Sequence, residues 1–165
     1  MNDATELFLA RVPDPDLPAL ELIIQYQGAI FGGFIRDLLT NTEPNDIDVM
    51  LFDSQVFEFV QELTALGYRS EGNKFSKPGA HSLDVNSIPL ISPFTQLCPG
   101  IEPDADVNLL LFRKGELTTW SRIPLAQIFS HLQSREAQVF TDSDPARVHK
   151  LQRTGYRILY ESSES

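Results

Sequence analysis

The sequence contains one cysteine and no long apolar run, and both absences restrict where the protein is expected to work. Cys98 has no partner for an internal disulfide, so nothing indicates an oxidising compartment. No apolar segment approaches the roughly 20 residues that a membrane-spanning helix requires. Residues 1–6 lack the basic start and apolar core of a secretory signal. The sequence therefore predicts a cytoplasmic protein with no membrane segment.

Basic residues are also scarce. The chain has 13 Lys and Arg against 23 Asp and Glu, a net charge of −10 over 165 residues. Phosphate neutralisation supplies most of the affinity for a long nucleic acid, so extended nucleic-acid binding is not expected. The Walker-type loop and the Gly-x-Gly-x-x-Gly fingerprint are absent as well, which argues against a P-loop or a dinucleotide-binding fold.

Short apolar strands and amphipathic helices are mixed along the chain. Helices are predicted at residues 20–26, 34–39, 54–66, 124–132 and 144–152, and strands at 29–31, 46–51, 68–75, 81–90 and 137–140, with apolar segments at 107–112 and 117–120. An aspartate of Asp14-Pro-Asp16 is expected to cap the first helix and Ser54 the third, and residues 92–103 are expected to form a loop. The buried face of the third helix is expected to carry Val56, Phe57, Val60, Leu63, Leu66 and Tyr68. Several neighbouring strands can pair without a crossover helix, which predicts an α+β domain with a mixed β-sheet. No linker-like segment interrupts residues 1–160, so one domain is expected there, with 161–165 as a frayed tail.

The candidate chemistry lies between residues 28 and 49. A predicted strand ends at Gly32-Gly33, where the missing side chains let the backbone approach a phosphate, and Arg36 follows early in the next helix. Asp46 and Asp48 alternate with apolar residues, so both carboxylates leave the same face of a strand, with Cβ atoms about 6–7 Å apart. Carboxylates at this spacing can bracket two Mg²⁺ (or Mn²⁺) ions about 3.5–4 Å apart.

These residues resemble a known family. Gly32-Gly-Phe-Ile-Arg-Asp-Leu-Leu39, followed by Pro44-Asn-Asp-Ile-Asp-Val49, is similar to the head domain of class II CCA-adding enzymes and bacterial poly(A) polymerases. That head domain belongs to the DNA polymerase β-like nucleotidyltransferase superfamily. Asp104-Ala-Asp-Val-Asn-Leu-Leu110 resembles a relaxed form of the Asp-Phe-Thr-Ile-Asn-Ala-Leu motif that follows in the same family.

The resemblance implies a nucleotidyltransferase-type mixed sheet flanked by helices. It implies metal at Asp46 and Asp48, and triphosphate near Gly32, Gly33 and Arg36. It also implies a third carboxylate on a neighbouring strand, for which Asp84 is the candidate because it alternates with Leu83 and Val85; Asp106 is the reserve. Asp37 is expected to pair with a nearby arginine.

Two departures limit what the resemblance implies. Glu102-Pro103 stands where the family has paired arginines, and the 165 residues do not cover the neck, body and tail with which those enzymes select bases and grip tRNA. We therefore expect metal-dependent transfer of a nucleoside monophosphate from a triphosphate such as ATP. The acceptor stays open between an RNA 3′ end, a protein hydroxyl and a small molecule, as does the need for a partner protein.

Two other functions compete with this one. A catalytically inactive nucleotide-binding or regulatory module on the same fold is the main alternative, and a plain interaction protein would leave the ordered motif as coincidence. Arg147, Lys150 and Arg153 fall on one face of the last helix, where a solvated basic surface is expected, with steering of a triphosphate or an acceptor as the alternative. The three histidines have no metal-ligand spacing and are expected at the surface or at element edges.

Overall fold

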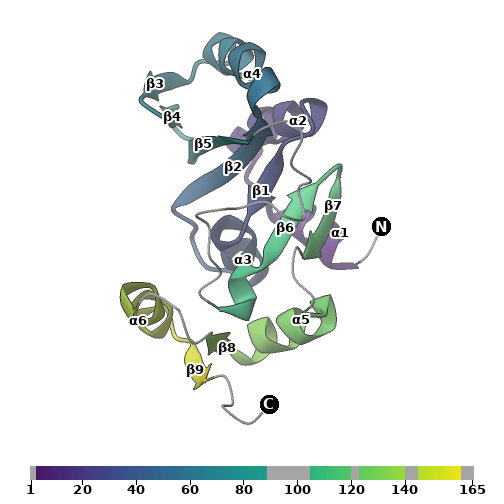
Figure 1. Cartoon of the computed structure of the whole chain (residues 1–165), viewed down its shortest axis with the longest axis vertical. Helices are drawn as coiled ribbons and strands as arrows, with labels where there is room; N and C mark the ends of the chain where they lie inside the picture. Colours follow the sequence, from purple (N-terminus) through teal and green to yellow (C-terminus); the bar gives the residue numbers. More distant parts are fainter. Residues whose placement is uncertain (1–2, 89–104, 120–122, 140–144, 161–165) are drawn as a thin grey trace.

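The computed structural model describes residues 3–88, 105–119, 123–139 and 145–160 (Figure 1). Its α-helices are α1 (Asp3–Arg11), α2 (Leu17–Gln25), α3 (Gly33–Leu39), α4 (Asp53–Ala65), α5 (Leu125–Ser134) and α6 (Pro145–Arg153). Two short 3-10 helices are η1 (Asp14–Asp16) and η3 (Asp106–Asn108). The strands are β1 (Ala29–Phe31), β2 (Asp46–Phe52), β3 (Arg69–Glu71), β4 (Lys74–Ser76), β5 (Ser82–Ile88), β6 (Leu110–Arg113), β7 (Glu116–Thr119), β8 (Glu136–Val139) and β9 (Arg157–Tyr160).

Seven of these strands form one mixed sheet in the order β3-β4-β5-β2-β1-β6-β7. The central pair β2 and β5 is parallel, and the other neighbouring pairs are antiparallel. Helix α4 leads from β2 towards β5 and contacts both strands, as a parallel connection requires. The predicted fold class, a single domain with a mixed sheet flanked by helices, is confirmed.

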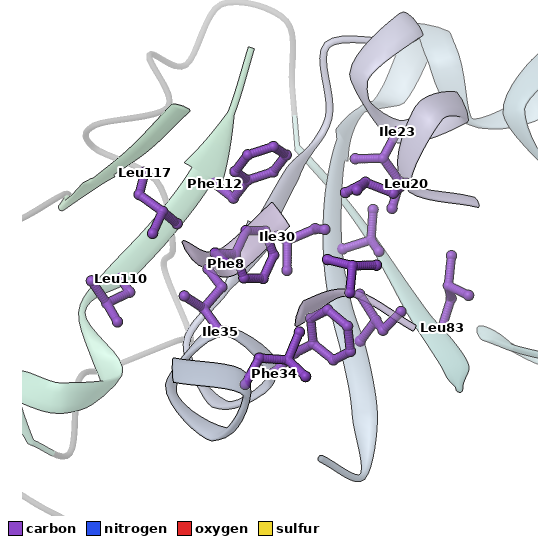
Figure 2. Close-up of a cluster of buried hydrophobic side chains, with 14 of the residues drawn as sticks. Phe8, Leu20, Ile23, Ile30, Phe34, Ile35, Leu83, Leu110, Phe112 and Leu117 are labelled. Atoms are coloured by element: carbon purple, nitrogen blue, oxygen red, sulfur yellow. The ribbon is translucent and has the colours of Figure 1, made fainter. Parts of the chain in front are cut away.

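The main hydrophobic core lies on one face of this sheet. Ile47, Val49 and Leu51 of β2 point into it, because alternate residues of a strand face the same side. Helices α1, α3 and α4 contact the sheet. Figure 2 shows Phe8 of α1 at the centre of this packing, with its ring centroid 6.1 Å from that of Phe34 and 5.1 Å from that of Phe112. Asp46 and Asp48 therefore lie on the opposite face of the sheet, together with their cross-strand neighbours.

A second unit of two parallel strands, β8 and β9, lies with α5 and α6 in the lower part of Figure 1. Arg135, between α5 and β8, connects it to the main sheet. One of its guanidinium nitrogens donates to the carbonyl of Thr40 at 2.7 Å, just after α3. The guanidinium also lies 5.5 Å from the ring centroid of Tyr156. The position of α6 is thus coupled to the end of α3.

Some local expectations were wrong. Residues 68–75 do not form one strand, because Gly72 adopts φ = 63° and the segment turns into the hairpin of β3 and β4. Helix α4 begins at Asp53, so Ser54 lies inside it. Phe57, predicted on the buried face of α4, is 72% exposed, and Phe59 and Leu63 are its fully buried residues. Helix α1 and strand β9 were not predicted.

The predicted loop at residues 92–103 and the predicted tail at 161–165 lie outside the described residues. Among the helices of the described segments, none has the length and apolar character needed to cross a bilayer.

Candidate active site

The chain turns sharply at Gly32, between β1 and α3. Gly32 has φ = 45° and ψ = −99°, a conformation that residues with a side chain avoid, and its N–H donates to the carbonyl of Leu110 at 3.0 Å. A Cβ at this position would lie 3.0 Å from the backbone oxygen of Asn108. Gly33 is different, since a Cβ there would meet only Nη2 of Arg36 within 4 Å, at 3.6 Å. The fold therefore requires the first glycine, whereas the second leaves open backbone.

This difference gives a paired prediction. Gly32→Ala should lower the free energy of unfolding by about 1–3 kcal/mol, because it forces a side chain into strained backbone. Gly33→Ala should change it by no more than about 1 kcal/mol, since alanine suits a helix start. Urea denaturation measures both. ATP binding to the folded Gly33→Ala protein then tests whether a phosphate approaches that backbone. Equal destabilisation by the two changes would contradict the assignment.

Arg36 and Asp37 belong to a buried network that joins α3 to η3. Arg36 is 9% exposed. Its Nε donates to Oδ1 of Asp37 at 3.0 Å, and its Nη1 donates to Oδ1 of Asn108 at 2.5 Å. The predicted pairing of Asp37 with an arginine is confirmed. The guanidinium thus has a structural role that the sequence did not reveal, while its Nη2 stays beside Gly33. The role of Arg36 towards a phosphate stays a prediction.

Three predicted site residues share the sheet face opposite the main core. Asp46 and Asp48 alternate along β2 with the buried Ile47 and Val49. Asp84 of β5 is the register partner of Asp48 in the parallel pair. The carboxylates of Asp48 and Asp84 therefore stand side by side on adjacent strands, with Asp46 one pleat further along β2.

The same cross-strand row continues on both sides of this pair. Phe31 of β1 is the register partner of Asp48, and Leu111 of β6 is the partner of Phe31. On the other side, Lys74 of β4 is the partner of Asp84. Asp48 thus lies between an apolar residue and a second carboxylate.

These surroundings perturb Asp48. Although the residue is exposed overall, desolvation by the protein around its carboxylate raises its pKa, and the negative charges of Asp84 and Asp46 raise it further. The positive charges of Lys150 and Arg147 on α6 act in the opposite direction. The basic face of α6, expected to be a solvated surface with a role towards a triphosphate as the alternative, therefore contributes to the electrostatics of the carboxylates.

The donor set has the chemistry of a magnesium site, because three carboxylates on one face offer hard oxygen ligands. The environment of Asp48 disfavours its ionised form, and a divalent cation nearby would stabilise that form. Nevertheless, within the described segments no three His, Cys, Asp or Glu side chains are placed so as to hold a metal ion. Asp46 instead pairs with Lys74, whose Nζ lies 3.3 Å from its Oδ2. The three carboxylates are thus of the right chemical type for a divalent cation and lie on the same face of the sheet. In the structure, however, Asp46 is paired with the ammonium of Lys74.

Asp106, the reserve candidate, is fully buried and hydrogen-bonded within the protein. Its Oδ2 accepts from Nδ1 of His131 at 2.5 Å and from Nε2 of Gln127 at 3.3 Å, while its Oδ1 accepts from the backbone N–H of Gln138 at 2.9 Å. These bonds tie η3 to α5 and β8. The register pairs Asp84 with Asp48, so Asp84 is a better candidate than Asp106 for a third carboxylate.

His81 is likewise engaged within the fold rather than at a free surface. Its Nδ1 lies 2.6 Å from Asp16 and its Nε2 lies 2.8 Å from Glu43. Burial lowers the pKa of His81, but the hydrogen bonds to Asp16 and Glu43 raise it overall. Asp16, one of the two aspartates expected to supply the cap of this helix, stands at the N-cap of α2 without a side-chain cap and binds His81 instead. This cluster joins the segments just before β2 and β5, where the site carboxylates begin.

Solved structures of CCA-adding enzymes and of a tRNA-processing enzyme share the fold of this chain. The CCA-adding enzyme of Thermotoga maritima complexed with tRNA matches with a TM-score of 0.68 and 20% identity, over 98% of this chain and 43% of that chain. A CCA-adding enzyme in complex with ATP matches with a TM-score of 0.68 and 20% identity, over 96% and 43%. A tRNA-processing enzyme in its apo form I matches with a TM-score of 0.64 and 18% identity, over 90% and 45%.

This chain therefore spans less than half the length of these structures. The sequence matches no family model, and it matches no curated protein sequence. At the identities found, the likeness establishes the fold alone.

Proposed function

We propose that this chain is a metal-dependent nucleotidyltransferase that transfers a nucleoside monophosphate from a triphosphate such as ATP to a hydroxyl acceptor. The observation that carries the proposal is the register of Asp48 with Asp84, with Asp46 on the same face. Desolvation by the surrounding protein raises the pKa of Asp48, and the negative charges of Asp84 and Asp46 raise it further, so a cation near these carboxylates would be stabilising. The likeness to a CCA-adding enzyme solved with ATP supports a triphosphate as the donor.

Each proposed site residue has a distinct task. Asp46, Asp48 and Asp84 would hold Mg²⁺ or Mn²⁺. The chemistry supplied there would be a lowered pKa of the attacking hydroxyl and neutralisation of charge on the pyrophosphate leaving group. Gly32 sets the turn that brings α3 against η3, and Gly33 offers open backbone to a phosphate.

Positive side chains complete the proposed site. Arg36 holds the helix next to this backbone through Asn108. Arg147 and Lys150 bring positive charge to the side of Asp48, where a triphosphate would need it. Fixed positive groups of this kind orient the phosphates for in-line attack.

The proposed acceptor is an RNA 3′ end. A likeness to a CCA-adding enzyme complexed with tRNA supports this choice over a protein or a small molecule. The net charge of −10 argues against a long nucleic-acid footprint, so contact is proposed only at the terminus.

The test is transfer of label from each of four α-³²P-labelled triphosphates, with Mg²⁺ or Mn²⁺. Total RNA, cell extract and the protein itself serve as acceptors, and Asp46→Ala/Asp48→Ala is the control. Label on RNA that disappears in the double variant is the expected result. Label on protein or on a small molecule would support nucleotidyl transfer but would show that the acceptor is not RNA. Neither transfer nor triphosphate binding would reject the nucleotide function.

A second candidate is a catalytically inactive nucleotide-binding module. The ion pair between Lys74 and Asp46, in a site without three converging ligands among the described residues, favours it. This candidate predicts triphosphate binding without label transfer from any of the four nucleotides.

A further inference from the structure

Lys74 approaches the carboxylates from the outer part of the sheet. On β4 its neighbour Phe75 points into the main core, so Lys74 lies on the carboxylate face. It is the register partner of Asp84, but its ammonium extends across β5 to Asp46 on the next strand. A positive group thus reaches over one site carboxylate to bind another.

This placement is not dictated by the hairpin that carries Lys74. Glu71 lies directly opposite Lys74 on β3, and such cross-strand neighbours are close enough to pair. The ammonium nevertheless lies 3.3 Å from Oδ2 of Asp46. The excess negative charge of three clustered carboxylates gives a physical reason for that choice.

We propose that Lys74 is a built-in counter-ion of this site, which competes with a divalent cation for Asp46 and so sets the affinity of the site for metal. The inference rests on the proposed function. In the metal-free protein the ammonium neutralises part of the charge of the three carboxylates. When a divalent cation binds, Lys74 leaves Asp46, and Glu71 is the carboxylate within its reach on the hairpin.

The strength of the ion pair is consistent with such an exchange. The side chains of Lys74 and Asp46 are 47% and 34% exposed. Ion pairs this open to solvent are weak and are screened by salt, so Lys74 can be displaced. A divalent ion offers Asp46 twice the charge and direct coordination. Lys74 therefore lowers metal affinity without blocking the site.

The experiment is titration of the full chain with Mn²⁺, followed by the electron paramagnetic resonance signal of the free ion. Lys74→Met keeps most of the side chain's apolar length and removes its charge, so it should bind Mn²⁺ about 3- to 10-fold more tightly. Lys74→Arg keeps the charge and should stay near the parent. Lys77→Met is the matched control, because Lys77 lies in the following turn with its ammonium 5.6 Å from the ring centroid of Tyr68.

A double-mutant cycle locates the effect. In an Asp46→Asn background, Lys74→Met should lose most of its gain, because the group over which the two cations compete is no longer charged. A full gain in that background would overturn competition at Asp46. Thermal melts of all variants check that each is folded at the titration temperature.

The remaining outcomes separate the two proposals. Equal or weaker Mn²⁺ binding by Lys74→Met, with measurable binding by the parent, overturns the role of Lys74 and leaves the proposed function intact. Equal increases in Mn²⁺ affinity from Lys74→Met and Lys77→Met would show that only the net charge of the protein matters. That result would also overturn the proposed role of Lys74. Absence of Mn²⁺ binding in both the parent and Lys74→Met overturns both proposals.

Discussion

Asp84→Asn is expected to lower nucleotidyl transfer on the order of 10²- to 10³-fold, the size typical of losing one preorganised electrostatic contact at a reacting centre. The same change should leave the protein at least as stable as the parent. Asp84 is in register with Asp48 on the adjacent strand, and its charge contributes to the raised pKa of Asp48. Removing the charge of the half-buried Asp84 relieves its repulsion with Asp48 at the edge of solvent, a gain of no more than about 0.5 kcal/mol.

The prediction is specific because transfer activity should fall while the free energy of unfolding should stay the same or rise. Label transfer under saturating Mg²⁺ and triphosphate measures the first, and urea denaturation measures the second. Glu116→Gln, an exposed acidic residue on β7 at the far edge of the sheet, is the matched control and should change neither. Asp84→Asn with parental transfer activity would show that the third carboxylate lies elsewhere or is not needed. Lost activity together with lost stability would indicate a structural role.

The local features of the site could be predicted from the sequence because their signals are local. The strand that ends at Gly32 needs only a short apolar run and two glycines. The common face of Asp46 and Asp48 follows from the period of a strand. Neither depends on which strands become neighbours.

The partners of these residues could not be predicted in the same way, because they depend on long-range pairing. Alternation placed Asp84 on a strand face, but its register with Asp48 follows from the parallel pairing of β5 with β2. The bond between Arg36 and Asn108 spans 72 residues, and that between His81 and Asp16 spans 65. No local pattern encodes such contacts.

Lys74 had a usable signal that was missed. Lys74-Phe75-Ser76 alternates polar and apolar residues, which would place the lysine on the same kind of face as Asp84. The expectation of one strand over residues 68–75 put Lys74 in the wrong element, because the turn at Gly72 was not recognised. The dipeptide Gly72-Asn73 between two short segments is a two-residue hairpin signal that the sequence itself carries. This dipeptide alone would have predicted a lysine on the same face of the sheet as the carboxylates.

Asp106→Ala is expected to be the most destabilising single change in the described part of the chain that we consider, at about 3–5 kcal/mol. The carboxylate is fully buried, and its removal leaves three donors without their acceptor: the ring of His131, the amide of Gln127 and the backbone N–H of Gln138. It also detaches η3 from α5 and β8. For a domain of this size the loss corresponds to a fall in melting temperature of roughly 6–20 °C.

Urea denaturation of Asp106→Ala measures the effect, with Asp14→Ala as the control. Asp14 is an exposed acidic residue in η1, and its removal should stay within about 0.5 kcal/mol of the parent. Asp106→Asn keeps one acceptor oxygen and should fall between the two. Because Asp106 is proposed to hold the fold and not the cation, the fraction of Asp106→Asn that is folded at low temperature should bind Mn²⁺ as the parent does. Lost Mn²⁺ binding with unchanged stability would instead make Asp106 the third carboxylate and remove Asp84 from the site.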